Sequence, residues 1–517
     1  MSSDASAIDG LAVDGGVRVP CVEEMSKRPD PVDDLRWDDE RATSLGAFVL
    51  ERWRELLQKL PSLPVSRRWR DLDLPRVLQL EVPDQPLARE AIEQRITSLM
   101  LEHSMYPGHP RFMAFITGAG TIPGAIGDLV AAILNQNVGG YRLAPAATEI
   151  EQFLGRWFGE QFGMPKGCGG LMVSGGAMAN FVALKAARDA KCGFSVRELG
   201  VAAGPRMSFY ASSEVHDVVT RAADMLGLGT DSVRKIKVDR ALRMDVAALE
   251  AAIDRDVAAG VRPLGVIGSA GTVSTGAIDP LDAIADVCAA RSLWFHVDGA
   301  YGALATLADE LRPLFKGLER ADSIAFDPHK WLYVPHSAGM LVVRDVQSLA
   351  AAFSLHPAYV REDKARTGHG VDLHVLGPQF SRGFQALKVW LSLISHGKKA
   401  YARRIAHDVA LTKYMGEEVR ARPLLELVSD GPLSICCFRY VPKGTHEATY
   451  LDALNERLMT ELQLDGRVFC SNAVVDGRFV LRACIVNFRT EAVDVDALLD
   501  VACELGERLH AELREHA

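Results

Sequence analysis

The stretch between residues 169 and 345 constrains the fold most strongly, because short apolar runs alternate there with amphipathic helical patterns. Apolar runs of this length are typical of buried parallel strands, and the intervening patterns are typical of crossover helices. We therefore predict an α/β fold with a mostly parallel seven-stranded sheet. Ligands of such sheets bind beyond the carboxyl ends of the strands. The expected strands cover residues 171–174, 207–210, 235–238, 264–268, 293–297, 323–326 and 339–343.

A helical arm is predicted ahead of this sheet. Apolar residues at helical spacing over 45–60 end at Pro61, and a second helical pattern covers residues 92–100. Because the proline-rich segment between them has little core of its own, the two helices cannot bury their apolar faces alone. We therefore predict that residues 1–105 form a tail and a dimerisation arm, and that the protein is a homodimer.

The chain after the parallel sheet follows a different pattern. Beyond a helix near residues 384–395, strand-like segments are joined by turn signals such as Asp430-Gly431 and Asp476-Gly477. A helical pattern over residues 493–513 closes the chain. These features predict a large α/β domain over residues 106–395 and a small α+β domain over residues 396–517.

Charge and cysteine content exclude several classes of protein. The chain carries 58 basic and 67 acidic side chains without long single-sign runs, so we expect no face for nucleic acid or for an anionic membrane. Nine scattered cysteines form no C-x-x-C pair, which favours buried thiols in a reducing compartment over a disulfide framework or a metal site. Residues 1–34 lack a signal-peptide core and no apolar run could span a bilayer, so we predict a cytoplasmic protein.

Lys330 has a setting that is unusual for a lysine. It stands in the run Asp327-Pro328-His329-Lys330-Trp331, between apolar segments over residues 323–326 and 331–335. A lysine that loses hydration favours the free amine, which can attack a carbonyl carbon near neutral pH. On these residues alone, a strand-end lysine whose ammonium reaches water is the simpler interpretation.

Two other strand ends carry groups that could serve a cofactor. The strand over 171–174 runs into Gly175-Gly176-Ala177 and a helical pattern, so backbone amides at a helix N-terminus are open to a phosphate. The strand over 293–297 ends at Asp298, a carboxylate that could keep a ring nitrogen protonated. The alternatives are a glycine turn without a ligand and an aspartate that caps the next helix. Dinucleotide-type G-x-G-x-x-G spacing is absent from this turn, which counts against a nicotinamide enzyme.

His216 and Thr272 occupy similar positions. His216 follows the strand over 207–210, and Thr272 and Ser274 follow the strand over 264–268. Each alone is explained as well by a half-exposed ring or by turn chemistry. Because the carboxyl ends of parallel strands meet at one edge of a sheet, the recurrence of such groups beside Lys330 indicates a single site.

These residues resemble the group II pyridoxal-phosphate-dependent amino-acid decarboxylases, which include aromatic-amino-acid, histidine and glutamate decarboxylases. The resemblance covers about residues 107–488. Its most specific element is HKW at His329 to Trp331. The runs HVDGAY, at His296 to Tyr301, and GPQFSRGFQALKVW, at Gly377 to Trp390, are nearly as specific.

The resemblance implies a pyridoxal-phosphate enzyme of fold type I in which each of these residues has a role. Lys330 would carry the cofactor as a Schiff base, Asp298 would pair with the pyridine nitrogen, and His216 would stack on the ring. In such a dimer the active sites lie at the subunit interface.

The resemblance also implies a phosphate site. Gly176, Ala177 and His329 would hold the phosphate, Ala300 would lie against the other face of the ring, and Thr272 would be a nearby polar contact. Family members often carry serine where Ala177 stands, so one phosphate hydrogen bond is missing here or comes from a backbone group.

Two further roles follow from the resemblance. Tyr359 stands at the position of the decarboxylases' tyrosine, where aldehyde-forming relatives tend to have phenylalanine. It would return a proton to Cα after carbon dioxide leaves. Arg382 would help to anchor the charge of the substrate or of the cofactor. Where aromatic-specific members have bulky residues, this chain has residues 137–140, Asn-Val-Gly-Gly. Arg111 and Arg142 could face the acidic side chain of a substrate, or they could be structural arginines.

We therefore predict a carboxy-lyase that uses pyridoxal phosphate to convert a small-molecule L-amino acid, aromatic by preference, into an amine and carbon dioxide. An aminotransferase and an oxidative aldehyde synthase on the same fold are the alternatives. A non-enzymatic binding protein would leave Lys330 idle, and the intact set Lys330, Asp298 and His216 argues against that.

Overall fold

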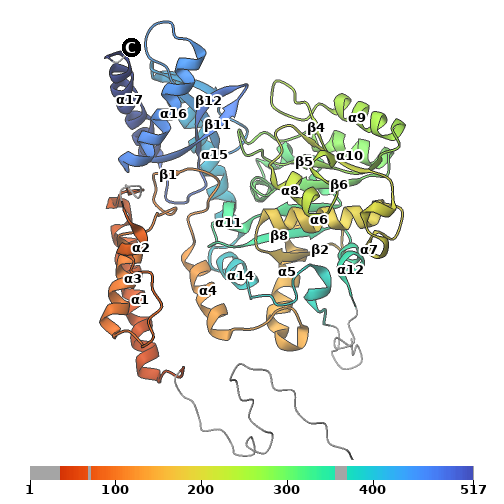
Figure 1. The fold of residues 1–517 in the computed structure, drawn as a ribbon, viewed down its shortest axis with the longest axis horizontal. Helices are drawn as coiled ribbons and strands as arrows, with labels where there is room; N and C mark the ends of the chain where they lie inside the picture. Colours follow the sequence, from red (N-terminus) through yellow and green to blue (C-terminus); the bar gives the residue numbers. More distant parts are fainter. Residues whose placement is uncertain (1–34, 68–71, 356–369, 516–517) are drawn as a thin grey trace, which may run out of the picture.

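The computed structural model describes residues 35–67, 72–355 and 370–515. Figure 1 shows three parts: a helical arm from the N-terminal residues, a large domain around one sheet, and a small domain that contains the C-terminal helix. Tyr359 lies outside the described residues, so its role stays a prediction. Within the described ranges, none of the helices has both the length and the apolar character needed to cross a membrane.

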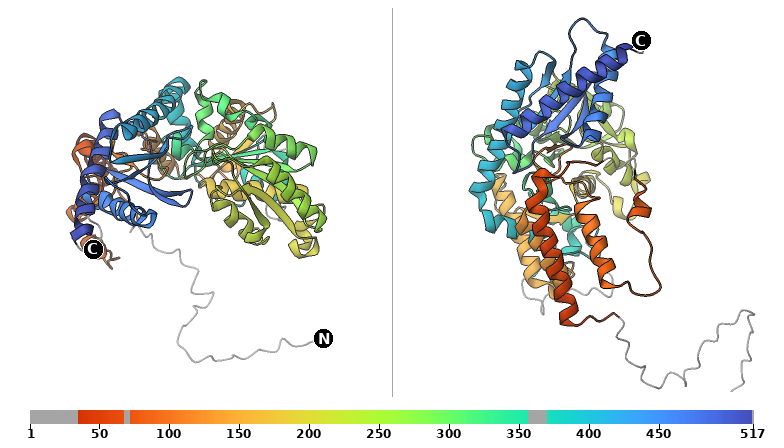
Figure 2. Two further views of the ribbon diagram at one scale, coloured as in Figure 1. Left: turned by 90° about the horizontal axis from the view of Figure 1, so that it is seen from above. Right: turned by 90° about the vertical axis from the view of Figure 1, so that its left-hand side faces the viewer.

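The arm consists of α1 (Asp39–Lys59), the short α2 (Leu74–Val77) and α3 (Arg89–Leu101). The side chain of Asp38 accepts a hydrogen bond of 2.6 Å from the backbone amide of Arg41 and so caps the start of α1. The two long helices lie side by side (Figure 2), yet neither contains a buried residue in the single chain. Both predicted helices are confirmed, and their apolar residues are left without a core.

Seven strands form the sheet of the large domain. Strand β8 runs antiparallel to both of its neighbours, and every other neighbouring pair is parallel. All of the predicted strands are confirmed, each within about two residues of its expected bounds. Their order in space is β2 (Gly169–Val173), β8 (Gly339–Val343), β7 (Ser323–Phe326), β6 (Trp294–Asp298), β5 (Arg262–Ser269), β3 (Met207–Ser212) and β4 (Val233–Ile236).

Helices cover this sheet on both faces. Every residue of β3, β6, β7 and β8 is buried, as expected for strands with helices on both sides. The helix α6 (Gly176–Lys191) packs across the central strands β5 to β8. The other helices of this domain used below are α4 (Ile122–Leu134), α5 (Pro145–Gln161), α9 (Val246–Ala258), α11 (Pro328–Trp331) and α14 (Ala386–His396).

The small domain contains a second, mostly antiparallel sheet backed by long helices. The strands, in spatial order, are β1 (Phe112–Met113), β11 (Phe469–Val475), β12 (Arg478–Cys484), β10 (Ile435–Tyr440) and β9 (Leu425–Ser429). The helices are α15 (Lys398–Ala421), α16 (Ala448–Asp465) and α17 (Ala492–Glu515).

The edge strand β1 differs from the expected division of the chain. It pairs in parallel with β11, and the ring centroids of Phe112 and Phe469 stack 5.4 Å apart. Residues 112–113 therefore belong to the small sheet, although they fall in the range expected for the large domain. A strand of two residues has no periodicity to detect, and its pairing depends on a partner more than 350 residues later in the chain.

Candidate active site

A cavity of about 350 Å³ lies where the carboxyl ends of the large sheet face the small domain. Its walls come from the ends of β3, β5, β6 and β7, from the start of α6, and from β11 and β12. The fold thus brings together residues from the separate strand ends at which the sequence analysis placed them. The predicted site residues that line the cavity are Gly176, Ala177, His216, Thr272, Asp298, Ala300 and Lys330.

Lys330 lies in α11, a single turn that follows β7. Its Nζ lies 3.0 Å from Oδ2 of Asp327, and its side chain is 20% exposed. Asp327 is buried, and its second oxygen, Oδ1, has no hydrogen-bond partner among the described residues. Lys330 therefore lines a cavity and pairs with a buried carboxylate, instead of extending from a strand end into bulk water.

A buried hydrogen-bond network holds the residues that follow Lys330 in the chain. The indole Nε1 of Trp331 and the hydroxyl of Tyr333 donate to Oδ2 of Asp408, at 3.0 and 2.6 Å. Arg404 Nε donates to the other oxygen of Asp408 at 2.9 Å. Burial raises the pKa of Asp408 to about 6, although the charge of Arg404 opposes this. Because α15 supplies Asp408, the position of α11 depends on the helix that leads into the small domain.

Asp298 is the last residue of β6 and is 7% exposed. Its Oδ1 accepts a hydrogen bond of 3.1 Å from the amide of Ala300, in the turn that follows the strand. Its carboxylate lines the cavity, and it has no ion pair within the described part of the chain. A buried carboxylate of this kind needs a positive partner, and a protonated ring nitrogen would provide one.

A second network ties strand β6 to the glycine turn. His296 lies two residues earlier on β6, on the same face of the sheet as Asp298. Its Nε2 lies 2.9 Å from Oδ1 of Asn180, and Asn180 Nδ2 donates to the carbonyl of Gly176 at 2.8 Å. Burial lowers the pKa of His296 to about 4, so the ring is neutral near pH 7 and leaves Asp298 without a competing cation.

The turn between β2 and α6 is shaped by close approaches. A Cβ atom at Gly339 of β8 would lie 2.4 Å from Cα of Gly175, so the neighbouring strand passes directly against the turn. A Cβ atom at Gly176 would lie 2.8 Å from Oδ2 of Asp327 and 3.1 Å from Cβ of Ala300. Glycine at these positions leaves the start of α6 open to the cavity, where its first backbone amides can bind a phosphate.

His216 and Thr272 face the same cavity. Nδ1 of His216 accepts a hydrogen bond of 3.1 Å from the amide of Val218, so Nε2 carries the proton of the neutral ring. The hydroxyl of Thr272 accepts a hydrogen bond of 3.1 Å from the amide of Ala277. Thr272 therefore shapes the turn after β5, as the turn-chemistry alternative expected, and lines the cavity as well.

His329 lies beside the glycine turn but does not line the cavity. Its Cε1 would be 3.6 Å from a Cβ atom at Gly175. Its Nδ1 bonds the carbonyl of Ala338 at 2.7 Å, and burial lowers its pKa. A phosphate at the start of α6 would therefore meet the edge of this ring, which the Ala338 backbone orients.

Arg382 is placed differently from the expectation. It is 7% exposed, and its Nη2 donates to Oε1 of Glu151 and, at 2.8 Å, to the carbonyl of Met172. Its guanidinium therefore connects α5 to β2 and does not line the cavity. In the single chain this arginine is structural, because its guanidinium is already paired with the buried carboxylate of Glu151.

The arginines considered for an acidic side chain also lie elsewhere. Arg111 Nε forms an ion pair of 3.2 Å with Asp494, at the junction of the arm and the small domain. Arg142 lines a separate cavity of about 890 Å³.

Arg482 is a site residue that the sequence analysis missed. It lies on β12, is 3% exposed, and lines the cavity. Its Nη1 donates to the carbonyl of Phe115 at 3.1 Å and to Oγ of Ser471 at 3.2 Å, whereas Nε and Nη2 have no partner among the described residues. The sequence did contain a signal for it, since Arg482 is the single charged residue in the apolar run of residues 479–486. Burying such a charge without a partner is costly, so an arginine at this position indicates a ligand or an ion pair.

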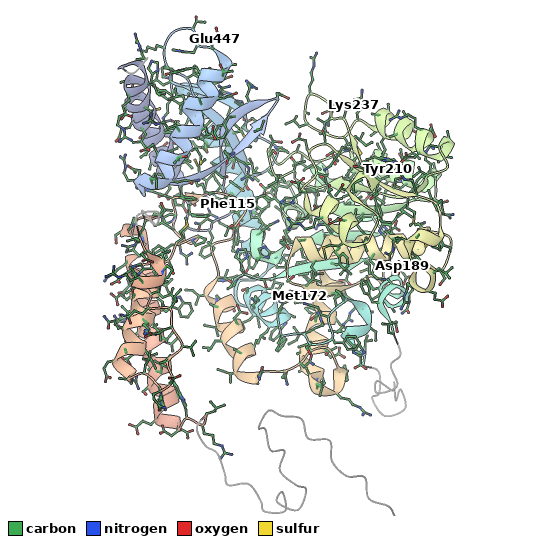
Figure 3. All side chains as sticks on the ribbon, viewed as in Figure 1. Phe115, Met172, Asp189, Tyr210, Lys237 and Glu447 are labelled. Atoms are coloured by element: carbon green, nitrogen blue, oxygen red, sulfur yellow. The ribbon has the colours of Figure 1, made fainter. Side chains whose placement is uncertain are left out.

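Phe115 was also missed. Figure 3 labels it between the small and large domains, and its φ of 55° is in the left-handed region, which is strained for an aromatic residue. The bond from Arg482 to its carbonyl, and a bond of 3.2 Å from its amide to Oγ of Ser471, hold this conformation. Phe115 and Ile116 thereby form an apolar wall of the cavity.

The groups around the cavity fit pyridoxal phosphate. The cavity presents an amine at Lys330 and a glycine cradle whose amides can bind a phosphate. It also presents the carboxylate of Asp298, which has no cation as a partner among the described residues. When bound, this cofactor supplies a conjugated ring that takes up the electron pair released with carbon dioxide. A mostly parallel sheet with this site at its carboxyl edge defines a pyridoxal-phosphate-dependent enzyme of fold type I.

Comparisons with known proteins agree. The profile of the pyridoxal-dependent decarboxylase conserved domain matches residues 72–441. The aromatic-L-amino-acid decarboxylase of Bacillus atrophaeus is 30% identical over 458 residues, which cover 89% of this chain and 94% of that protein. The cysteine sulfinic acid decarboxylase of Mus musculus is 34% identical over 372 residues, 72% of this chain and 75% of that one.

Solved structures give the same result. The crystal structure of Oryza sativa TDC with PLP and tryptamine superimposes with a TM-score of 0.84 at 28% identity, covering 93% of this chain and 100% of that one. The chain belongs to the pyridoxal-dependent decarboxylase family. It is a carboxy-lyase that acts on an amino acid with pyridoxal phosphate as its cofactor.

Proposed function

We propose that the protein decarboxylates an L-amino acid with an aromatic or otherwise apolar side chain. The observation that carries this preference is the composition of the cavity wall. Four side chains of phenylalanine, isoleucine and valine line the space, and Arg482 is the only arginine among the described residues that line it. One arginine pairs with one carboxylate, so a second carboxylate on an acidic side chain would have no fixed cation. These four side chains belong to Phe115, Ile116, Val218 and Val273.

The proposal gives one task to each of four residues that line the cavity and to Tyr359, which lies outside the described residues. Lys330 binds the cofactor covalently, and Asp298 holds a proton at the ring nitrogen. His216 packs on the ring, and Arg482 positions the carboxylate of the substrate. Tyr359 returns a proton to Cα of the product. The apolar side chains of the wall limit the access of water to these contacts, which strengthens each of them.

The test is a competition among substrates. We would incubate the purified protein and pyridoxal phosphate with an equimolar mixture of the common L-amino acids and cysteine sulfinate, and follow carbon dioxide and amines by mass spectrometry. We expect amines of aromatic amino acids to form about tenfold or more faster than amines of acidic ones, because an unpaired buried charge costs at least about 1.4 kcal/mol. Dominant products from acidic substrates would contradict the proposal.

Exchanging Arg482 for methionine is expected to raise KM by about tenfold to a hundredfold while kcat changes little. The reason is that a charge-assisted hydrogen bond contributes about 1.5–3 kcal/mol to binding. The measurement is the steady-state rate against substrate concentration at saturating cofactor. Arg439→Met is the matched control, because Arg439 is a buried arginine on the neighbouring strand β10 and does not line the cavity. Equal effects of the two substitutions would make Arg482 a purely structural residue.

Tyr359 decides between amine and aldehyde in this proposal. The variant Tyr359→Phe is expected to bind the cofactor and release carbon dioxide, but to return a proton to Cα poorly, because phenylalanine has no acidic hydrogen. General acid catalysis contributes about 10² to 10⁴-fold to a rate. The rate of amine formation should therefore decrease by a factor in that range. Amine, aldehyde and hydrogen peroxide would be measured in one reaction under air. Amine formation at the parent rate, without aldehyde, would make His216 the next candidate for the proton donor.

We also propose a homodimer, supported by an apolar face that the single chain leaves uncovered. On α4, Ile122, Ile126, Leu129 and Ile133 share one side of the helix and are 41–73% exposed. The uncovered apolar residues of α1 and α3 point to the same conclusion. A second copy of the chain is the occupant that closed symmetry favours.

The double variant Ile126→Glu, Ile133→Glu is expected to sediment as a monomer of 56.2 kDa, whereas the parent chain sediments at twice that mass. Burying two carboxylates in an apolar contact costs several kcal/mol. The control variant Val257→Glu changes a similarly exposed apolar residue of α9, and this variant should remain dimeric.

Deleting residues 1–100 should give insoluble or inactive protein. A fully active monomer from either change would rule out a required dimer.

The cysteines support a cytoplasmic location, which we propose for this enzyme. All eight cysteines among the described residues carry free thiols, and seven of them are buried. Thiols of this kind persist in a reducing compartment.

A further inference from the structure

His329 is a buried imidazole beside the glycine turn, and its protonation decides what it can bind. It is 8% exposed and directly precedes Lys330 in α11. Its Cε1 would lie 3.6 Å from a Cβ atom at Gly175, and its Nε2 lies 3.8 Å from Oδ2 of Asp327. That carboxylate oxygen would in turn lie 2.8 Å from a Cβ atom at Gly176. The Cε1–Nε2 edge of the ring therefore faces the start of α6.

The hydrogen bond at Nδ1 fixes the tautomer of the neutral ring of His329. Nδ1 lies 2.7 Å from the carbonyl oxygen of Ala338. A carbonyl oxygen can only accept a hydrogen bond, so Nδ1 carries the proton. The backbone amide of Ala338 lies farther away, 3.3 Å from the same ring nitrogen. In the neutral ring, Nε2 is then a lone pair that accepts hydrogen bonds and cannot donate one.

The groups around His329 favour the neutral ring in the chain alone. Burial is the largest influence and lowers its pKa, the charge of Asp327 raises it, and the charges of His336 and Lys330 lower it. The ring centroids of His329 and His336 are 4.3 Å apart, and burial lowers the pKa of His336 as well. Nζ of Lys388 bonds the carbonyl of His336 at 3.3 Å, which adds another positive charge on that side. The first turn of α6 carries no charged side chain, so it does not offset these effects.

A phosphate at the start of α6 reverses this balance. A phosphate monoester carries close to two negative charges near pH 7. It repels a lone pair at Nε2, whereas a protonated Nε2 donates a charge-assisted hydrogen bond to it. A negative charge within about 4–6 Å raises the pKa of such a ring by roughly 1–3 units. Ala177, at the same turn, has no hydroxyl that could donate in place of the ring.

We propose that His329 binds the phosphate of the cofactor as an imidazolium, so that binding takes up one proton at Nε2. The proton comes from solvent when the phosphate enters and returns to solvent when it leaves, while Nδ1 stays bonded to Ala338. Because the pKa of the ring is higher in the bound state, the added affinity is present below that pKa and is lost as the pH rises through it. This role rests on the phosphate site proposed at Gly176.

The test compares pyridoxine phosphate with pyridoxine on the full chain freed of cofactor, by titration calorimetry. Neither compound has an aldehyde, so covalent chemistry at Lys330 does not enter, and the shared ring leaves the phosphate as the only difference. The ratio of the Kd of pyridoxine to that of pyridoxine phosphate should fall about tenfold from about pH 6.5 to about pH 8.5. Near pH 7, in buffers of different ionisation enthalpy, the phosphate ester should take up at least about half a proton more than pyridoxine. Equal proton uptake by the two compounds would overturn the proposal.

Two variants assign the proton to one of the adjacent rings. His329→Gln places an amide N–H near the position of Nε2, and this group donates without taking up a proton. The Kd ratio of this variant should therefore stay constant to within about twofold over the same pH range. His336→Gln is the matched control, because it changes the neighbouring imidazole, and it should keep the pH dependence of the parent. A pH dependence that is lost in His336→Gln but kept in His329→Gln would overturn the proposal.

The phosphate site and the role of His329 fail in different ways. If pyridoxine phosphate binds no more tightly than pyridoxine at any pH, the start of α6 is not a phosphate site and the proposed site is wrong. If pyridoxine phosphate binds more tightly by a factor that does not change with pH, the site stands and only the imidazolium role of His329 is wrong.

Discussion

Replacing Lys330 with alanine is expected to lower turnover by about 10⁴-fold or more, because the variant loses both the covalent link to the cofactor and an amine that can exchange protons. Binding of the cofactor should persist in part, since the glycine cradle at Gly176 and the carboxylate of Asp298 remain. The measurements are the rate of amine release and the amount of pyridoxal phosphate retained after gel filtration.

Borohydride reduction of the parent protein, followed by a tryptic map, gives the direct assignment. The adduct is expected on Lys330 alone. Lys185 is a demanding internal control, because it is also a partly buried lysine paired with an aspartate in the large domain. An adduct on Lys185 or on any further lysine would refute the assignment.

Replacing Asp298 with asparagine is expected to lower the chemical step by about 10² to 10³-fold or more. The carboxylate holds a proton at the ring nitrogen, and a neutral amide of the same shape cannot do so. Removing one preorganised electrostatic contact from a buried site typically costs about 3–4 kcal/mol in the transition state. Single-turnover rates at saturating cofactor would measure the loss separately from any change in cofactor affinity.

Asp256→Asn provides the matched control for Asp298. Asp256 is also a buried aspartate of the large domain, but it accepts hydrogen bonds from Tyr210 and Arg234 and does not line the cavity. Its loss should affect stability and leave the chemical step nearly unchanged. If Asp298→Asn kept near-parental turnover with cofactor bound, the carboxylate would be a feature of the strand end only.

Most of the large domain could be predicted because its signals are local. Each buried strand is a short apolar run. Strand β6 ends at Asp298, and polar or glycine residues directly follow β2 and β7, which marks the edge where ligands bind. The rule that parallel strands end at a common edge was enough to group Lys330, Asp298, His216 and Thr272 before their positions were known.

Arg482 and Arg382 show where this reasoning stops. Both are buried arginines, Arg382 in a family motif and Arg482 in an apolar strand. No local pattern indicates which of the two faces the cavity. Arg382 is paired with Glu151 within the large domain, whereas Arg482 lines the cavity and two of its nitrogens have no partner in the described part of the chain. The difference comes from contacts between segments far apart in the chain.

The amino-acid sequence by itself determined the parallel sheet, the strand ends that carry the site and the lysine at its centre, because apolar periodicity and motif residues are properties of neighbouring positions. Only the tertiary structure decided how the small domain closes the cavity with Arg482, that Asp327 pairs with Lys330, and that β1 joins the small sheet. Those outcomes depend on the distance between side chains and on their access to water, which the packing of the whole chain sets.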